Sequence, residues 1–364
     1  MKIRLKSLKK AIFKILKKSL PPTLLCLFLF FTNLFFFGYR NAIIALPMTF
    51  IFNRLFKRSP DKWCPFSLFL INICLSFFAY LATLNIGISI TIDFFITYLM
   101  VFFLTDSDTS KVYFSYGFGF VLFQSFSITF HEMGSRLIAI SYSSFLTFIA
   151  LIIFFLITKK ETGYSFNINI LNPFYHLKEK IRLFITTLKK SFYNLLFILR
   201  IHLFTYDRLN IDATSFDLRK TRFALRIALL ITFTFFLERI FNIPKGYWLP
   251  LNVFIMTLPF YEDSVIKIRE RLIGNVAGVF VSALLLHFLK GYTWHMIILS
   301  VATFFAYAVN NYAFRSGYMT CYAIALSTLF MKESEIFELR LAYVFLAAII
   351  SIIGSRFIFV NKKE

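Results

Sequence analysis

The feature that most constrains this chain is a succession of apolar segments, many of them close to the length of about 20 residues with which an α-helix crosses a bilayer. Six lie in the first part of the chain, at 12–37, 41–53, 66–85, 88–104, 112–130 and 136–158. Six more lie in the second part, at 220–241, 247–260, 271–289, 293–310, 313–331 and 339–360. We therefore predict an all-α polytopic membrane protein with about twelve transmembrane helices.

Composition excludes two other classes of protein. Hydrophobic residues make up 59% of the 364 residues, which is too apolar for a surface that faces water. A transmembrane β-barrel would alternate apolar and polar residues, and that alternation is absent. The net charge of +22 would suggest nucleic acid in a soluble protein, but here Lys and Arg fall between apolar segments, where lipid headgroups lie. We predict the lipid bilayer as a partner and no nucleic acid.

The distribution of basic residues predicts an orientation. The first twenty residues carry eight of them, and the second and eighth connections between the segments are also basic. Cytoplasmic connections are enriched in Lys and Arg, and an even number of spans returns the chain to its starting side. We therefore predict a multi-pass protein of the plasma (inner) membrane with both termini in the cytoplasm.

A basic linker separates two groups of six segments. Residues 159–219 contain apolar side chains at a spacing of three to four, with Lys and Arg on the other face. This pattern predicts an amphipathic helix that lies along the inner headgroups or beneath the bundle. The expected organisation is a first membrane half (1–158), the cytoplasmic linker (159–219) and a second membrane half (220–364).

The two halves resemble each other. At a constant offset of 208 residues, Gly38-Tyr39 aligns with Gly246-Tyr247 and Met48-Thr49 with Met256-Thr257. Further on, Arg136-Leu137 and Arg340-Leu341 each open the last long apolar segment of their half. Because each half has an even number of spans, we predict two parallel six-helix repeats that enclose a pathway at their interface.

Three ordered motifs in the second half carry a family resemblance: TRFALRIAL at 221–229, IPKGYWLPLNVFIMTLP at 243–259 and IRERLIGNVAGVF at 268–280. They resemble the fusaric-acid-resistance-like family of the aromatic acid exporter superfamily. The resemblance implies two six-helix bundles and the export of small organic anions, often aromatic carboxylates, driven by the proton gradient. A remoter similarity to aluminium-activated malate transporters keeps passive anion flow open as an alternative. A single chain and a homodimer both stay open.

Four basic residues are candidates for an anion-binding mouth. Arg222 and Arg226 are four residues apart, so they share a helix face, and at the offset of 208 they align with Lys14 and Lys18. In one interpretation, all four surround an inner vestibule below the short segments and attract an organic anion. In the other, their side chains extend to the lipid headgroups without any role in transport.

The short segment 247–260 holds two further candidates for substrate binding, Trp248 and Asn252. Trp248 could stack on an aromatic substrate, and the nearby Pro250 could leave a backbone carbonyl unpaired; an interfacial Trp beside a structural kink is the alternative. Gly274 and Gly278 lie four residues apart, and this spacing predicts close helix packing in a membrane.

Asp93 stands out as an acidic residue inside an apolar segment, ISITIDFFITYLM. An intramembrane carboxyl group can carry a proton, so Asp93 is a candidate for proton coupling. A hydrogen-bonded structural role near the membrane surface is the alternative.

Enzyme motifs are missing: His131-Glu132 lacks the second His of HExxH, and neither GxSxG nor a Walker sequence occurs. We predict neither an enzyme nor a cofactor nor a metal site. A structural or regulatory membrane subunit that does not transport anything is the remaining class, and a flux assay with the reconstituted protein would separate it from a transporter.

Overall fold

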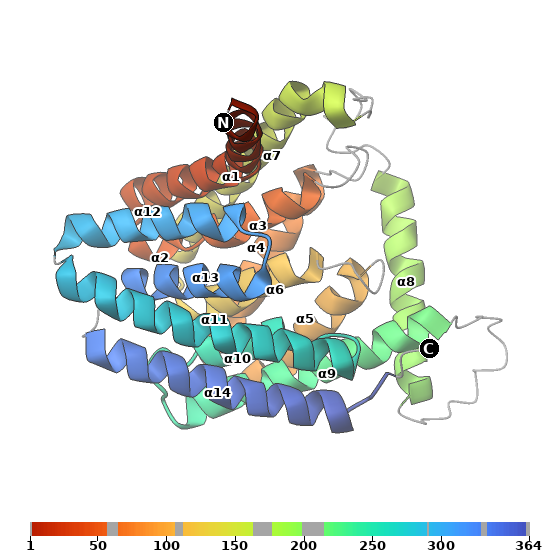
Figure 1. Ribbon diagram of the computed structural model, residues 1–364. Coiled ribbons are helices and arrows are strands. Elements are labelled where there is room, and N and C mark those ends of the chain that lie inside the picture. Colours follow the sequence, from red (N-terminus) through yellow and green to blue (C-terminus); the bar gives the residue numbers. More distant parts are fainter. Residues whose placement is uncertain are drawn as a thin grey trace.

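The computed structural model describes residues 2–56, 65–105, 112–162, 177–198, 215–289, 291–328 and 333–361 (Figure 1). These residues form helices joined by short connections, and none of the residues described is in a strand. The all-α class predicted from the sequence is therefore confirmed.

Each predicted apolar segment corresponds to a helix, or to two short helices in the case of 41–53. The first half contains α1 (Lys2–Phe37), α2 (Tyr39–Ala42), α3 (Ala45–Leu55), α4 (Pro65–Leu84), α5 (Ile86–Leu104), α6 (Val112–Ser125) and α7 (Met133–Thr162). The linker contains α8 (Leu177–Ile198). The second half contains α9 (Ser215–Ile240), α10 (Trp248–Met256), α11 (Tyr261–Phe288), α12 (Tyr292–Ala308), α13 (Tyr312–Ser327) and α14 (Glu333–Phe357).

Five of the described helices are long and apolar enough to cross a membrane, and they comprise parts or all of α1, α5, α7, α11 and α14. Their outer faces are apolar: along α1, for example, Leu20, Leu24, Phe28, Phe31 and Phe35 are all exposed at a spacing of three to four residues. Such stripes suit a lipid environment and not water. The chain is a multi-pass membrane protein, and the full number of twelve spans stays a prediction.

The short helices α3 and α10 lie inside the bundle. Met48 of α3 and Met256 of α10 have no exposed surface, and α10 packs against α6, α9 and α14. Because a helix of this length does not span the hydrocarbon layer, its ends lie within the protein, where neighbouring helices can satisfy its backbone groups. These interior ends help to build the site described below.

The two halves contact each other through matching pairs of helices. The first helix of the first half, α1, packs against α12, and the first helix of the second half, α9, packs against α5. Within the halves, α4 packs on α6 and α3 on α7, and likewise α11 packs on α13 and α10 on α14. Reciprocal contacts of this kind are what a two-fold repeat requires, although the repeat itself stays a prediction.

The crossing of α11 and α13 depends on glycine. A Cβ atom added to Gly278 would lie 2.6 Å from the carbonyl oxygen of Gly317, so the backbones meet without side chains between them. A Cβ atom added to Gly274 would lie even closer to the carbonyl oxygen of Ala313. The packing role predicted for Gly274 and Gly278 is confirmed.

The linker helix α8 runs across one end of the bundle, at a steep angle to the membrane helices (Figure 1). It contacts α9, and Lys190 forms an ion pair of 2.6 Å with Asp217. Ile185 and Phe192 on α8 are exposed beside Lys189, as expected for an amphipathic helix at a lipid surface. The linker residues 163–176 and 199–214 lie outside the described residues.

Candidate functional site

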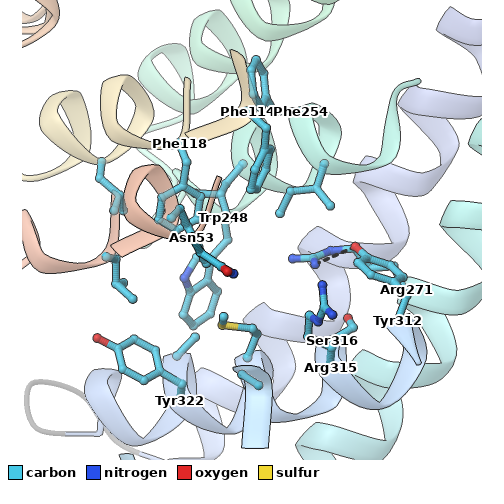
Figure 2. A pocket seen from close by; sticks show the side chains of 18 of the residues that line it. Asn53, Phe114, Phe118, Trp248, Phe254, Arg271, Tyr312, Arg315, Ser316 and Tyr322 are labelled. Atoms are coloured by element: carbon cyan, nitrogen blue, oxygen red, sulfur yellow. Dashed lines mark hydrogen bonds between the residues drawn. The ribbon is translucent and has the colours of Figure 1, made fainter. Parts of the chain in front are cut away.

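A cavity of about 430 Å³ lies between the two halves (Figure 2). Side chains from α1, α3 and α6 of the first half line it, together with side chains from α10 to α14 of the second half. The volume falls in the range of about 300–1,000 Å³ that is typical of small-molecule sites. The cavity is therefore large enough for a small organic ligand.

Aromatic rings make up much of the wall. The first half contributes Phe50, Tyr113, Phe114, Phe118 and Phe126, and the second half contributes Tyr247, Trp248, Phe254, Tyr307, Tyr312 and Tyr322. Phe114 stacks on Phe254 across the two halves with ring centroids 5.9 Å apart, and Phe50 meets Phe118 edge to face at 5.0 Å. Such a wall offers both faces and edges of rings to a flat apolar ligand.

The charged residues that line the cavity are all basic: Lys18, Arg54, Lys267, Arg271, Arg315 and Arg340. No Asp or Glu is among the described residues of the wall. Low-dielectric surroundings strengthen the field of these charges, so the cavity attracts anions.

Three of the cations, Lys18, Arg54 and Arg315, come from helix segments at the end of the bundle where α8 lies. In Figure 1, α12 and α13 meet at that end, which places Arg315 in the first turn of α13 there. Arg315 donates to the carbonyl oxygen of Val309 at 3.0 Å, and it lies within electrostatic range of both Lys18 and Arg54. Lys18 donates to the side-chain oxygen of Asn310. These groups form a cationic mouth.

Two arginines lie deeper in the protein. Arg271 of α11 donates through Nε to the side-chain oxygen of Asn252 at 2.9 Å and through Nη1 to the hydroxyl of Tyr312 at 3.2 Å. The guanidinium of Arg340 lies over the ring of Trp248, 4.9 Å from its centroid. Since α14 begins at the end of the bundle opposite α8, Arg340 lies toward the far end of the cavity (Figure 1).

Of the residues predicted to bind substrate, Lys18 and Trp248 line the cavity. Asn252 lies behind the wall, where its Nδ2 donates to the carbonyl oxygen of Trp248 at 2.7 Å and its oxygen accepts from Arg271. Arg222 is half-buried on α9 and is not part of the wall. Lys14 lies in α1, but its side chain is outside what the structure describes.

Arg226 requires a correction, because the structure places it away from the predicted vestibule. Its side chain is fully buried, and its nitrogens donate to four backbone carbonyls, those of Leu258, Pro259, Ile358 and Phe359, at 2.8–3.3 Å. These carbonyls follow the last residues of α10 and α14, where a helix leaves its acceptors unpaired. Arg226 therefore joins two helix ends and does not line the cavity.

Asp93 is fully buried and lies outside the cavity wall. Its carboxylate accepts from Ser89 at 2.7 Å and from Gln124, and Gln124 in turn accepts from Arg239 at 2.9 Å. Asp93 thus belongs to a polar cluster between α5, α6 and α9. These hydrogen bonds account for a structural role, and proton coupling through Asp93 stays a prediction.

Sequence reasoning missed the site roles of Arg54, Arg271, Arg315 and Arg340. Arg54 and Arg271 served only to orient the chain, and Arg340 served only to align the halves. A basic residue near the end of an apolar segment has the same local pattern whether it faces headgroups or a cavity.

A second cavity of about 250 Å³ adjoins the first. Its wall includes Tyr39 at the start of α2, Lys245 between α9 and α10 and Ser327 at the end of α13, and the end of α13 lies opposite α8 (Figure 1). Four side chains line both cavities: Ile43, Phe126, Tyr247 and Leu326. These four residues, which we call the partition, border both spaces.

Together, these features describe a multi-pass membrane protein whose apolar helices enclose a cationic, aromatic cavity. The family follows from comparison with known proteins: residues 229–354 match the family model described as fusaric acid resistance protein-like. This match confirms the resemblance seen in the motifs: over these residues, about a third of the chain, the protein is similar to that family.

Two curated relatives match the chain. One is an uncharacterized protein of Haemophilus influenzae, 27% identical over 108 residues, which are 29% of this chain and 15% of the relative. The other is the uncharacterized protein YhfK of Escherichia coli, 23% identical over 116 residues, which are 31% of this chain and 17% of the relative. The matched part thus spans about a sixth of each relative. No solved structure shows significant similarity.

Proposed function

We propose that this protein exports small aromatic carboxylates and that the cavity between its halves is the binding site. One observation carries the proposal: six basic and eleven aromatic residues line the cavity, and no acidic residue is among the described residues of its wall. The family, whose description refers to resistance to an aromatic acid, supports the same class of substrate.

The physical argument concerns the cost of moving an anion through hydrocarbon. A carboxylate that loses its water without a partner costs several kcal/mol, and nearby guanidinium groups offset that cost through charge and paired hydrogen bonds. The benzene ring of the substrate gains from contact with the aromatic wall. A cavity with both features favours an aromatic anion over an inorganic anion or a neutral ring.

The orientation follows from the cationic mouth. The start of α13, which contains Arg315, lies at the same end of the bundle as the basic helix α8 (Figure 1), and Lys18 and Arg54 lie within electrostatic range of Arg315. By the positive-inside rule this end faces the cytoplasm, with both termini and the linker on that side of the plasma membrane. In this orientation the mouth collects anions from the cytoplasm, which is the direction that export needs.

The partition favours a carrier over an open anion channel. Ile43, Phe126, Tyr247 and Leu326 border both the large cavity and the smaller one at the opposite end, and in our proposal they close the path between the two. A channel requires a continuous path, whereas a carrier exposes its site to one side at a time. We therefore propose that the structure corresponds to a state open to the cytoplasm.

The test is flux in proteoliposomes with phthalate, an aromatic dicarboxylate whose two charges keep it from leaking through bare lipid. Wild-type protein should exchange labelled phthalate faster than empty vesicles do. A variant with Lys18→Gln, Arg54→Gln and Arg315→Gln should be slower, most clearly at low substrate concentration and low salt. Arg222→Gln is the matched control, because Arg222 lies outside the wall.

Two results would contradict the proposal. If wild-type vesicles exchange phthalate no faster than empty vesicles, the protein does not transport this substrate. If the triple variant matches the wild type at every salt concentration, the cavity is not the transport pathway. Phthalate movement that never saturates would instead support the passive channel.

Proton coupling belongs to the proposal as a separate part, with Asp93 as the candidate. If Asp93 carries the coupled proton, Asp93→Asn should abolish the acceleration of phthalate flux by an imposed pH gradient while exchange at equal pH continues. If Asp93 only holds α5 and α6 together through Ser89 and Gln124, both activities should fall in parallel with the amount of folded protein.

A further inference from the structure

The most unusual charged group in the cavity is Arg340. Its side chain is 2% exposed, and its Nε is buried without a hydrogen-bond partner. No hydrogen bond or ion pair to another described residue satisfies its guanidinium, which lies over the ring of Trp248, 4.9 Å from the ring centroid. Buried arginines are normally paired, because an unpaired charge away from water is strongly unfavourable.

A second buried arginine, Arg271, adds a further positive charge that no acidic side chain in the described part of the wall offsets. Arg271 is 5% exposed, lines the same cavity and lies within electrostatic range of Arg340. Its recorded partners, the amide of Asn252 and the hydroxyl of Tyr312, are both neutral. Two like charges in one low-dielectric space repel each other, and no acidic residue is among the described residues of the wall to compensate them.

The side chains around Arg340 and Arg271 leave one side from which an anion can approach them. Trp248 covers one side of the Arg340 guanidinium, and Asn252 and Tyr312 hold Arg271 in place. Figure 2 shows the Arg271 guanidinium with its bond to Tyr312 on the edge of the space that also borders Trp248. The open approach to both arginines is therefore the cavity itself.

We infer that Arg340 and Arg271 together bind the carboxylate of the transported anion deep in the cavity, with Arg340 on the side of the partition. This assignment rests on the proposed function, and we call Arg340 and Arg271 the carboxylate anchor of that site. The carboxylate supplies the negative charge that the protein lacks, since the planar guanidinium of Arg matches a carboxylate with two parallel hydrogen bonds. The aromatic ring of the ligand then extends toward the ring-lined part of the wall.

The basic residues of the cavity therefore have two different roles, according to whether they lie at the mouth or deep in the cavity. Lys18, Arg54 and Arg315 at the mouth attract an anion over a distance, so salt should screen their effect. Arg340 contacts the anion in a space from which water is excluded, so salt should change its effect little. This difference gives the experiment its control.

The experiment measures binding of benzoate to the purified protein in detergent, with benzamide as the neutral ligand of the same shape. Trp63→Phe and Trp294→Phe leave Trp248 as the remaining tryptophan of the three, so its fluorescence reports on the site directly. Wild type should bind benzoate much more tightly than benzamide. Arg340→Gln should lower the affinity for benzoate at least tenfold at both low and high salt and leave that for benzamide unchanged. The affinity of Arg340→Lys for benzoate should lie between those of the wild type and Arg340→Gln.

The control is Arg315→Gln, which removes one charge from the same cavity at its mouth. Its affinity for benzoate should fall at low salt and recover toward that of the wild type at high salt. Without ligand, Arg340→Gln should melt at or above the temperature of the wild type, because it removes an uncompensated charge.

The outcomes distinguish the anchor from the proposed function. If Arg340→Gln binds benzoate as well as the wild type does, or unfolds without ligand, Arg340 is a structural residue and the anchor is wrong, while the cavity remains the binding site. If the wild type binds neither benzoate nor phthalate, the proposed function fails and the anchor fails with it.

Discussion

Two buried arginines near the starts of α7 and α14 show how differently the halves use the same kind of residue. Arg136, 1% exposed, donates to the side-chain oxygen of Asn41 and to the carbonyls of Arg40, Phe123 and Phe126, at 2.9–3.3 Å. Arg340, 2% exposed, donates to none of the described residues and lies over Trp248. In the predicted repeat the two positions correspond.

The hydrogen-bond acceptors around a buried arginine indicate whether it serves the fold or a ligand. Four acceptors around Arg136 satisfy its guanidinium within the protein, so its contribution is to the fold. Arg340 lacks such acceptors and borders the cavity, so the protein leaves it available to a ligand. If the halves arose from one six-helix unit, the second half has converted a structural position into a binding position.

The largest effect is expected for Arg136→Gln. The substitution leaves several buried acceptors without a donor, and hydrogen bonds to a charged group contribute about 1.5–3 kcal/mol each. We expect a large fall in the melting temperature of the purified protein and a low yield of folded protein. A variant as stable as the wild type would contradict the structural role and, with it, the comparison.

Arg226→Gln should have a similar but somewhat smaller effect. Its acceptors are carbonyls that follow the last residues of α10 and α14, where fraying can expose part of them to water. The melting temperature should fall, while phthalate flux per folded molecule stays close to that of the wild type. If the variant is as stable as the wild type but loses flux, Arg226 takes part in transport. Arg222→Gln is again the control.

Trp248→Leu should weaken binding and also lower the melting temperature, because Trp248 is fully buried and the smaller side chain leaves a cavity. It removes the ring under Arg340, and a desolvated cation–π contact contributes about 2 kcal/mol. We expect the affinity for benzoate to fall by roughly tenfold or more, measured by calorimetry because this variant lacks the fluorescent reporter. An unchanged affinity would show that Trp248 neither positions Arg340 nor contacts the ligand.

The smallest effect is expected for Arg40→Gln. Arg40 pairs with Glu132 at 2.8 Å, but the side chains are 39% and 42% exposed, and such surface pairs contribute little. The backbone carbonyl of Arg40 accepts a hydrogen bond from Arg136 of α7, and the substitution keeps this carbonyl. The melting temperature should match that of the wild type within error. A marked fall would show that Arg136 depends on the neighbouring charge.

Much of the fold was predictable because helix positions in a membrane follow from local apolar length. The sequence predicted the segments that became the helices, the amphipathic α8 and the close approach at Gly274 and Gly278. Trp248 and Lys18 were also identified in advance, since a Trp and a Lys near the ends of short or basic segments are candidates by residue type alone.

The remainder of the site depends on tertiary contacts. The spacing of Arg222 and Arg226 fixed a helix face but not its neighbours, and the carbonyls that bind Arg226 come from residues 32 to 133 positions further along the chain. Arg271 and Arg340 lie 69 positions apart (340 minus 271) and meet only because α11 and α14 pack together. No local pattern separates a cation that pairs with a carbonyl from one that faces a cavity.

The most direct test of the central claim is a crystal structure of the protein with 4-bromobenzoate, because the anomalous signal of bromine marks the ring. We predict one bromine peak among the aromatic residues of the cavity, with the carboxylate within hydrogen-bond distance of Arg340 and Arg271. Bromine peaks only on the lipid-facing surface, or a carboxylate that points to the mouth and leaves Arg340 without a partner, would contradict the account.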